Sequence, residues 1–183
     1  MVRVLDDLAK DGKTPMAGAT ARYGSSLFGW AVKRGALASN PFQRVPVAPT
    51  VRRDRVLSDD EIRRVWKSTE GPGAFNAIVR ALLLTGQRRE EVSGLMWGEL
   101  DPDFSGWTLP AARSKNGQPH VIPLSEEMQN LLRAQPRVEG THLVFPGERG
   151  LFSGWSKSKA RLDRRSSLSG WTLHAAARSL HRL

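Results

Sequence analysis

Residues 57–97 read LSDDEIRRVWKSTEGPGAFNAIVRALLLTGQRREEVSGLMW, and this stretch decides the fold. Ser58, followed three positions later by Glu61, forms a capping box, which predicts the start of a helix. Gly71-Pro72-Gly73 ends that helix, and Thr85-Gly86 separates a second helix from a short third one over residues 89–97. The second helix is predicted by apolar residues at i, i+3, i+4, i+7 and i+8, namely Phe75, Ile78, Val79, Leu82 and Leu83.

Downstream of this stretch, the sequence predicts one hairpin and three more helices. Asn116-Gly117 lies between extended runs over 107–112 and 120–124, which is typical of a β-hairpin. Helices are expected from Ser125, over 153–165, and from Leu173 after a Thr172 cap, with an extended piece at Leu143–Phe145. Helices with a small antiparallel hairpin sheet indicate a mostly α (α+β), bundle-like domain over 57–183.

Upstream, residues 1–43 read as a partial helical domain. Helices are expected over Val2–Lys10 and Ala19–Arg34. Residues 44–56 hold two prolines and four arginines, so they are interpreted as a linker, with a loop packed on the second domain as the alternative. In the longer helix one face is expected to be buried, and it consists of Tyr23, Leu27, Trp30 and Ala31.

The composition favours a polyanionic partner. Lys and Arg total 28 against 18 Asp and Glu, which gives a net charge of +10 and an isoelectric point near 11.0. The alternative is a basic, solvated surface without a partner. The absence of cysteine excludes disulfides, cysteine nucleophiles and thiolate metal sites. No apolar run approaches the ~20 residues of a membrane span, and the N-terminus does not resemble a signal peptide, so a soluble, cytoplasmic protein is expected.

A stripe of basic residues is predicted on one face of the helix over 153–165. An amphipathic helix of this kind can run beside a DNA backbone, and the alternative is a charged face that only meets solvent. Arg178, in the last helix, is a further candidate for DNA contact. The stripe has the spacing i, i+4, i+7 and i+8 and consists of Lys157, Arg161, Arg164 and Arg165.

Three residues are candidates for chemistry, and each has a plainer alternative. Arg88 is expected at a helix start, where it could bind an anion or simply pair with Glu90 or Glu91. Lys115 is expected near the hairpin tip, where most lysines are only solvated. His174 opens the last helix, and a lone histidine is more often structural.

The order of five segments resembles the catalytic domain of the tyrosine recombinase (phage integrase) family. They are LLLTGQRREEVSGLMW, WTLPAARSKNGQPHVIPLS, LVFP, GWSKSKARLD and GWTLHAAARS. The stretch SLFGWAVKRGALASNPF resembles the end of the family's helical core-binding domain. The resemblance implies that Arg88 holds the scissile phosphate, Glu91 supports Arg88, Lys115 is the general acid and His174 binds phosphate. It implies no metal and no cofactor.

The sequence departs from the family pattern in two places. In the family's His-x-x-Arg motif, the second arginine is replaced by Ala177, within the run Ala175–Ala177, and Arg178 comes one residue too late. The chain ends nine residues after His174, before the family's C-terminal tyrosine, so a catalytic domain truncated at its C-terminus and lacking its nucleophile is expected. Tyr23 is the only tyrosine, and its place in residues 1–43 argues against a nucleophilic role.

The leading hypothesis is therefore an integrase-like protein, of prophage type, that binds double-stranded DNA and is catalytically defective. The alternative is a non-catalytic DNA-binding module that occupies attachment sites or pairs with a full-length recombinase. Self-association is a further expected interaction. Two rival hypotheses are residual phosphodiester cleavage and a general RNA-binding role.

Overall fold

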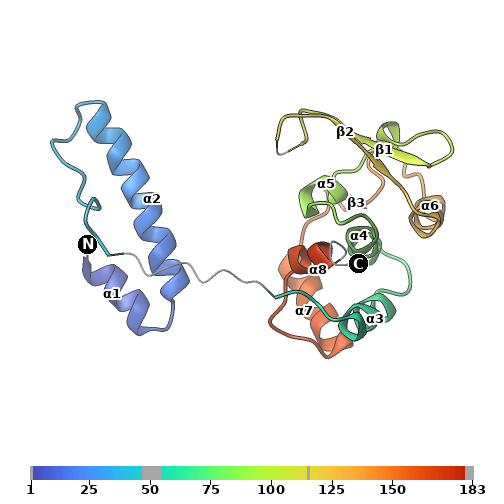
Figure 1. Cartoon of the computed structure of the whole chain (residues 1–183), viewed down its shortest axis with the longest axis horizontal. Helices are drawn as coiled ribbons and strands as arrows, with labels where there is room; N and C mark the ends of the chain where they lie inside the picture. The colour runs from blue at the N-terminus through green and yellow to red at the C-terminus, as the bar shows by residue number, and fades with distance from the viewer. Residues whose placement is uncertain (1, 47–54, 115, 180–183) are drawn as a thin grey trace. The chain divides into compact units, whose positions relative to one another are not determined.

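The computed structural model describes residues 2–46, 55–114 and 116–179 and divides the chain into two compact units, Met1–Arg53 and Asp54–Leu183 (Figure 1). The assignment of the first unit to a core-binding domain and of the second to a catalytic domain stays a prediction. Each unit is described by itself below.

The first unit is a pair of helices, α1 (Val2–Lys10) and α2 (Thr14–Lys33). Leu5, Ala17 and Ala21 form its small buried cluster, because the two alanines let α1 approach α2 closely. The chain after α2 folds back, and the Phe42 ring packs where a side chain on Gly24 would come within 2.4 Å of it. Gly24 is therefore required for this close approach.

The face of α2 that the sequence predicted to be buried is exposed. The exposed fraction is 78% for Tyr23, 62% for Leu27 and 56% for Trp30, and Ala31 is half-buried. The prediction was wrong because a helical period identifies a face but not the side on which a neighbour lies. In this unit α1 packs on the small residues Ala17 and Ala21 instead.

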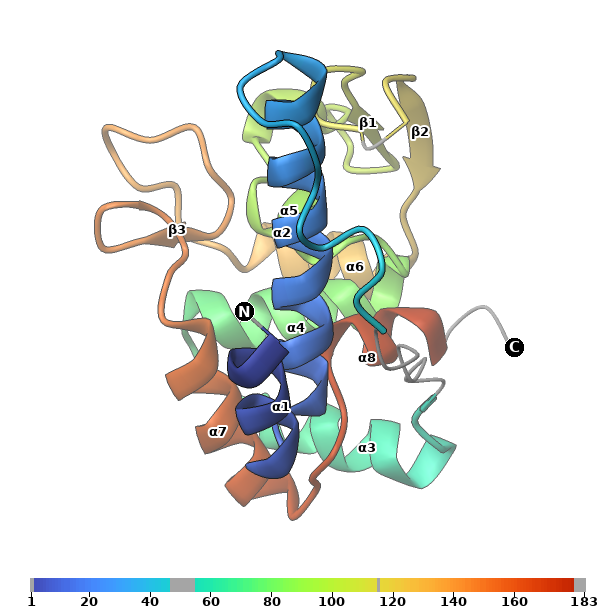
Figure 2. The same cartoon turned by 90° about the vertical axis from the view of Figure 1, so that its left-hand side faces the viewer.

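The second unit is built around α4 (Ala74–Thr85), whose side chains are buried along most of its length. Helix α8 (Leu173–Ser179) and helix α6 (Glu126–Arg133) pack directly on α4, and α3 (Asp59–Ser68) packs on α7 (Trp155–Ser166) (Figure 2). The buried residues of α4 are Phe75, Ala77, Ile78, Val79, Ala81, Leu82 and Leu83.

The helix starts follow the local sequence signals. The Ser58 hydroxyl accepts a hydrogen bond from the Glu61 amide at 3.3 Å, and the Glu61 carboxylate accepts one from the Ser58 amide at 3.0 Å. This confirms the predicted capping box of α3. The helix expected over 89–97 is shorter, because α5 ends at Ser93 (Arg89–Ser93) and a 3-10 helix, η1, follows over Trp97–Glu99.

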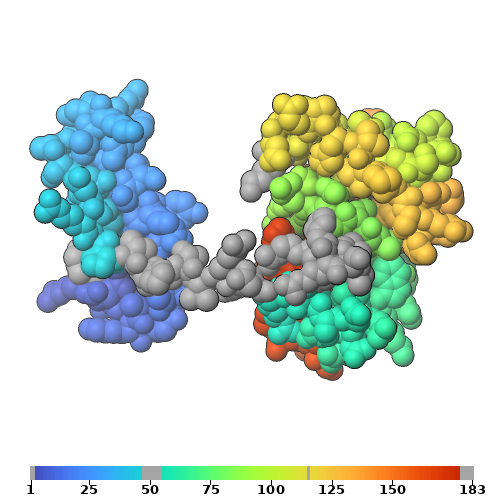
Figure 3. Space-filling model, viewed as in Figure 1, coloured from blue at the N-terminus to red at the C-terminus, as the bar shows by residue number. Residues whose placement is uncertain are grey.

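Two small antiparallel hairpins complete the second unit. Strands β1 (Gly106–Leu109) and β2 (His120–Pro123) form the predicted hairpin, with Trp107 opposite Ile122, and it lies over one end of the unit in yellow in Figure 3. Strands β3 (Pro146–Gly147) and β4 (Gly150–Leu151) were not predicted. The described residues thus confirm the mostly α class with small antiparallel sheets.

The burial of α4 predicts a large cost for truncating it. Leu82 is fully buried, so Leu82→Ala should lower the free energy of unfolding by about 2–5 kcal/mol, through lost contacts and the cavity left behind. Urea denaturation of the whole chain measures this. Val121→Ala, at an exposed strand position, serves as the control and should change the value by less than about 0.5 kcal/mol. Equal losses for both variants would contradict the assigned core.

Candidate functional site

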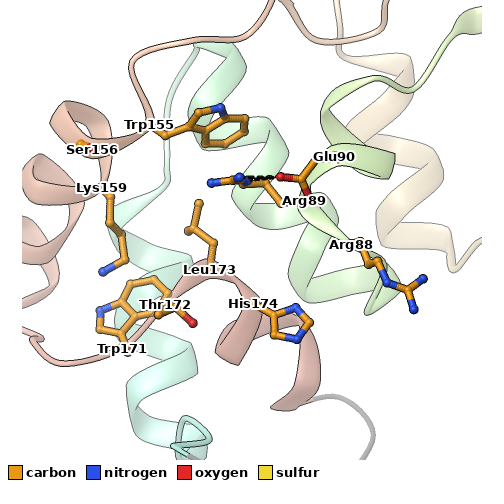
Figure 4. Close-up of a pocket in the computed structure, with 10 residues that line it drawn as sticks. All are labelled: Arg88, Arg89, Glu90, Trp155, Ser156, Lys159, Trp171, Thr172, Leu173 and His174. Atoms are coloured by element: carbon orange, nitrogen blue, oxygen red, sulfur yellow. Dashed lines mark hydrogen bonds and ion pairs between the residues drawn. The ribbon is translucent and has the colours of Figure 1, made fainter. Parts of the chain in front are cut away.

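A pocket of about 660 Å³ opens where α5, α7 and α8 meet (Figure 4). It collects residues that lie up to 86 positions apart in the sequence, from Arg88 to His174. Two candidates from the sequence, Arg88 and His174, share this pocket. The full lining consists of Arg88, Arg89, Glu90, Trp155, Ser156, Lys159, Trp171, Thr172, Leu173 and His174.

Arg88 stands at the start of α5 and is held by Glu91. The Arg88 amide donates to Glu91 Oε2 at 3.0 Å, and Arg88 Nη1 donates to Glu91 Oε1 at 3.0 Å. The Glu91 side chain is 3% exposed, whereas that of Arg88 is 43% exposed. The ion pair with Glu91, the plainer alternative for Arg88, is therefore present. It uses one guanidinium nitrogen, Nη1, and Arg88 is one of the residues that line the pocket.

His174 is exposed at the start of α8. The Thr172 hydroxyl accepts a hydrogen bond from the Ala175 amide at 3.1 Å, which confirms Thr172 as the cap of this helix. The imidazole lies between Arg88 and the Trp171–Thr172 segment in Figure 4. A ring at this position can donate a hydrogen bond to an anion that also contacts Arg88.

The remaining charge beside Arg88 is an exposed ion pair. Arg89 Nε donates to Glu90 Oε1 at 3.0 Å, and the Arg89 guanidinium lies 4.9 Å from the centre of the Trp155 ring. The hydrogen bond from Arg89 is the main cause that lowers the pKa of Glu90, and the nearby His174 lowers it further. Glu90 therefore stays ionised to a more acidic pH than an ordinary glutamate and offsets the charge of Arg89.

Lys159 is a pocket residue that the sequence reasoning missed. Its ammonium lies 3.8 Å from the centre of the Trp171 ring and 2.6 Å from Asp163 Oδ1, and its side chain is 17% exposed. Trp155, Lys159 and Asp163 follow one another at i, i+4 and i+8, which places them on one face of α7. That spacing is the sequence signal for Lys159, and the more basic stripe lies on another face of the same helix.

The basic stripe of α7 is exposed and lies apart from the pocket. Positions 157 and 159 differ by about 200° around a helix, so Lys157 and its companions point away from the Lys159 side. Within the stripe, Arg165 donates to Asn76 Oδ1 at 3.1 Å. The structure brings Arg88 and His174 together, but it does not bring the stripe to them. The exposed members are Lys157, Arg161, Arg164 and Arg165.

The structure does not describe the side chains of two other candidates. Lys115 lies outside the described residues. Arg178 belongs to α8, but its side chain is outside the described part of the chain. The hairpin that carries Lys115 in the sequence is present, as the pairing of β1 and β2 shows.

The three alanines of α8 are packed rather than open to the pocket. Ala175, Ala176 and Ala177 are all buried, and α8 packs on α4. Position 177, where the resemblance implies a second arginine, therefore offers no room for a long charged side chain in this arrangement. A guanidinium there would require α8 to move or turn.

Among the described residues, no group of three or more His, Asp or Glu side chains is arranged to hold a metal ion. In the same part of the chain, no helix has the length and apolar character needed to cross a membrane. The pocket is lined by the guanidinium groups of Arg88 and Arg89, the Lys159 ammonium, the Glu90 carboxylate, the His174 imidazole and the rings of Trp155 and Trp171. This set suits an anionic ligand with a flat or apolar neighbour.

Comparison of the sequence with known proteins finds similarity to the same family as the motifs do. No protein-family model matches the chain. The chain is 31% identical over 127 residues to prophage integrase IntZ of Escherichia coli, which covers 66% of this chain and 32% of IntZ. It is 29% identical over 131 residues to tyrosine recombinase XerC of Xylella fastidiosa, which covers 68% of this chain and 44% of XerC. The matched part thus spans less than half of these curated relatives.

Comparison with solved structures identifies the fold. The chain matches lambda integrase residues 75–356, solved as a dimer bound to a COC′ core site, with a TM-score of 0.75 and 21% identity over 98% of this chain and 70% of that one. The Tn1549 transposon integrase, solved with circular intermediate DNA, matches with a TM-score of 0.62 and 17% identity over 97% of this chain and 69% of that one. The fold is that of these integrases, and the resemblance inferred from the motifs is confirmed.

Because Glu90 pairs with Arg89, its negative charge should lower the affinity of the pocket for anions. Glu90→Gln removes the negative charge, so the affinity for inorganic phosphate should rise about 2- to 5-fold, the effect of one exposed ion pair. Titration followed by NMR chemical shifts measures it at neutral pH, where the lowered pKa keeps Glu90 ionised. Glu70→Gln, an exposed glutamate outside the pocket lining, is the control. An unchanged affinity in Glu90→Gln would contradict the assignment.

Proposed function

We propose that this chain, a relative of the phage-type tyrosine recombinases, binds double-stranded DNA by its backbone phosphates at the pocket of Arg88 and His174. The DNA-bound lambda integrase and Tn1549 integrase structures, which share the fold, support a DNA ligand. The net charge of +10 supports a polyanionic partner independently. DNA recombination is the process in which such a protein would take part.

The observation that carries the proposal is the convergence of Arg88 and His174 on one pocket. Arg88 is fixed through a buried carboxylate, so its guanidinium is held in place before the ligand arrives. A planar guanidinium can donate two hydrogen bonds to one phosphate, and an imidazole can donate another from a different side. Backbone phosphates are the ligands that this geometry suits.

We also propose that these 183 residues do not join DNA to themselves. Attack on a phosphodiester builds charge on its non-bridging oxygens, and two arginines are expected to stabilise that charge. Position 177 holds a buried alanine, so one of the two is missing. The only tyrosine, Tyr23, belongs to the first unit and not to the pocket. The proposed activity is therefore phosphate binding without covalent strand transfer.

The DNA binding should be electrostatic and steeply salt dependent. We expect a nonspecific dissociation constant on the order of 10⁻⁴–10⁻⁶ M near physiological salt. Arg88→Gln should weaken binding on every duplex and lower the slope of log K against log salt by about one. Fluorescence anisotropy with a labelled duplex at four salt concentrations measures both. Arg63→Ala is the control, because Arg63 is exposed and already paired with Asp60 at 2.7 Å.

The same measurement distinguishes a general DNA-binding protein from a module that occupies specific attachment sites. A strong preference for one attachment sequence over a scrambled duplex would favour a module that occupies such sites. Lys157→Ala/Arg161→Ala tests the exposed stripe, and a slope lower by about two would place both residues at phosphates. Binding that is insensitive to salt and to Arg88→Gln would contradict the proposed function.

A suicide substrate tests the absence of covalent chemistry. This is a nicked duplex that traps a protein–DNA adduct, which is then resolved on a denaturing gel. We expect no shifted band from this chain, because no tyrosine lines the pocket. A band that disappears in Tyr23→Phe would overturn the proposal, and a band that survives it would reveal a nucleophile other than tyrosine.

A further inference from the structure

We propose that Arg113 is a positioning residue for the Arg88 phosphate site. It would fix α5 from its C-terminal side, so that Arg88 at the N-terminal side meets a phosphate in one orientation. This inference rests on the proposed function, because its effect is read through phosphate binding. Arg113 follows strand β1 and is not a pocket-lining residue.

The contacts of Arg113 join three separate segments. Arg113 Nη2 donates to the main-chain carbonyl of Glu91 in α5 at 2.7 Å. Arg113 Nη1 donates to both carboxylate oxygens of Glu99 in η1. Its own amide donates to the Pro110 carbonyl at 3.0 Å, which closes the turn after β1. One guanidinium therefore ties the hairpin, η1 and α5 together.

The Glu99 carboxylate makes this contact rigid. The Glu99 side chain is 8% exposed, and it also accepts hydrogen bonds from Trp107 Nε1 at 3.1 Å and from the Met96 amide at 3.2 Å. A buried carboxylate with several donors has little freedom to move, since each lost bond leaves an unsatisfied charge. Arg113 is thus anchored at one end before it reaches Glu91.

The bond to Glu91 completes a relay to Arg88. The last four carbonyls of a helix have no donor within the helix, and Arg113 supplies one to Glu91 in α5, which has only five residues. The same Glu91 holds Arg88 through both of its carboxylate oxygens. Main-chain and side-chain atoms of one buried residue therefore connect Arg113 to Arg88.

Gly94 is the position at which the sequence makes room for this contact. A Cβ on Gly94 would lie 2.8 Å from Arg113 Nη2 and 3.2 Å from the Glu90 carbonyl. Any side chain here would press on the guanidinium where it reaches α5. Gly94→Ala consequently disturbs the bond without removing a charge, which makes it an independent probe of the same contact.

The test is a double-mutant cycle on the whole chain, with a labelled duplex as the ligand. Arg113→Lys keeps the charge opposite Glu99 but cannot reach Glu99 and Glu91 together, since lysine has a single ammonium. We expect it to weaken DNA binding about 3- to 10-fold, and to have almost no effect when Arg88→Gln is already present. Gly94→Ala should behave in the same way if Arg113→Lys does not fold.

Arg80→Lys is the matched control. Arg80 also donates to a carbonyl at the end of a helix, from Nη2 to Trp66 in α3 at 3.4 Å, but within the described residues it forms no hydrogen bond or ion pair with Glu91 or Glu99 and does not line the pocket. It should lower the thermal unfolding midpoint without a change in binding. The inference would be overturned if Arg113→Lys weakened DNA binding equally in the wild-type and the Arg88→Gln backgrounds. It would also be overturned if Arg113→Lys did not weaken DNA binding at all. If Arg88→Gln alone bound DNA as tightly as the wild-type chain, the proposed function would be overturned instead.

Discussion

The buried carboxylate of Glu91 is the constraint on which the site depends. A carboxylate that is 3% exposed must be satisfied by charged or polar donors, and here Arg88 supplies both its amide and its guanidinium. The need to satisfy this carboxylate fixes the turn between α4 and α5, and it also fixes the direction of the Arg88 side chain. The packing of α8 on α4 then brings His174 to the same place.

Much of this arrangement could be predicted from local sequence signals. The capping box at Ser58 and Glu61 and the apolar period of α4 each act over a few residues, and each formed as expected. The strands on either side of Asn116-Gly117 pair as expected, but the first strand ends at Leu109, before the predicted residue 112. The exposed face of α2 could not be predicted, because period alone does not reveal what covers a face. The β3–β4 hairpin, of two residues in each strand, is too short to leave a pattern.

The candidate site was predictable only in part. Arg88 and His174 were found through motifs, and the pocket unites them. Lys159 was missed because its charge is used against Trp171 and Asp163 inside the unit, while the more conspicuous stripe faces outward. Arg113 was missed because its contacts reach Glu99 and Glu91, 14 and 22 positions away in the chain. Such contacts are set by tertiary packing, which has no local signature.

The most direct measurement is a crystal structure of this chain with a short DNA duplex. The account predicts a backbone phosphate within hydrogen-bonding distance of the Arg88 guanidinium and the His174 ring, with Glu91 still bound to Arg88. A duplex seated on another surface, with the pocket free of phosphate, would contradict it.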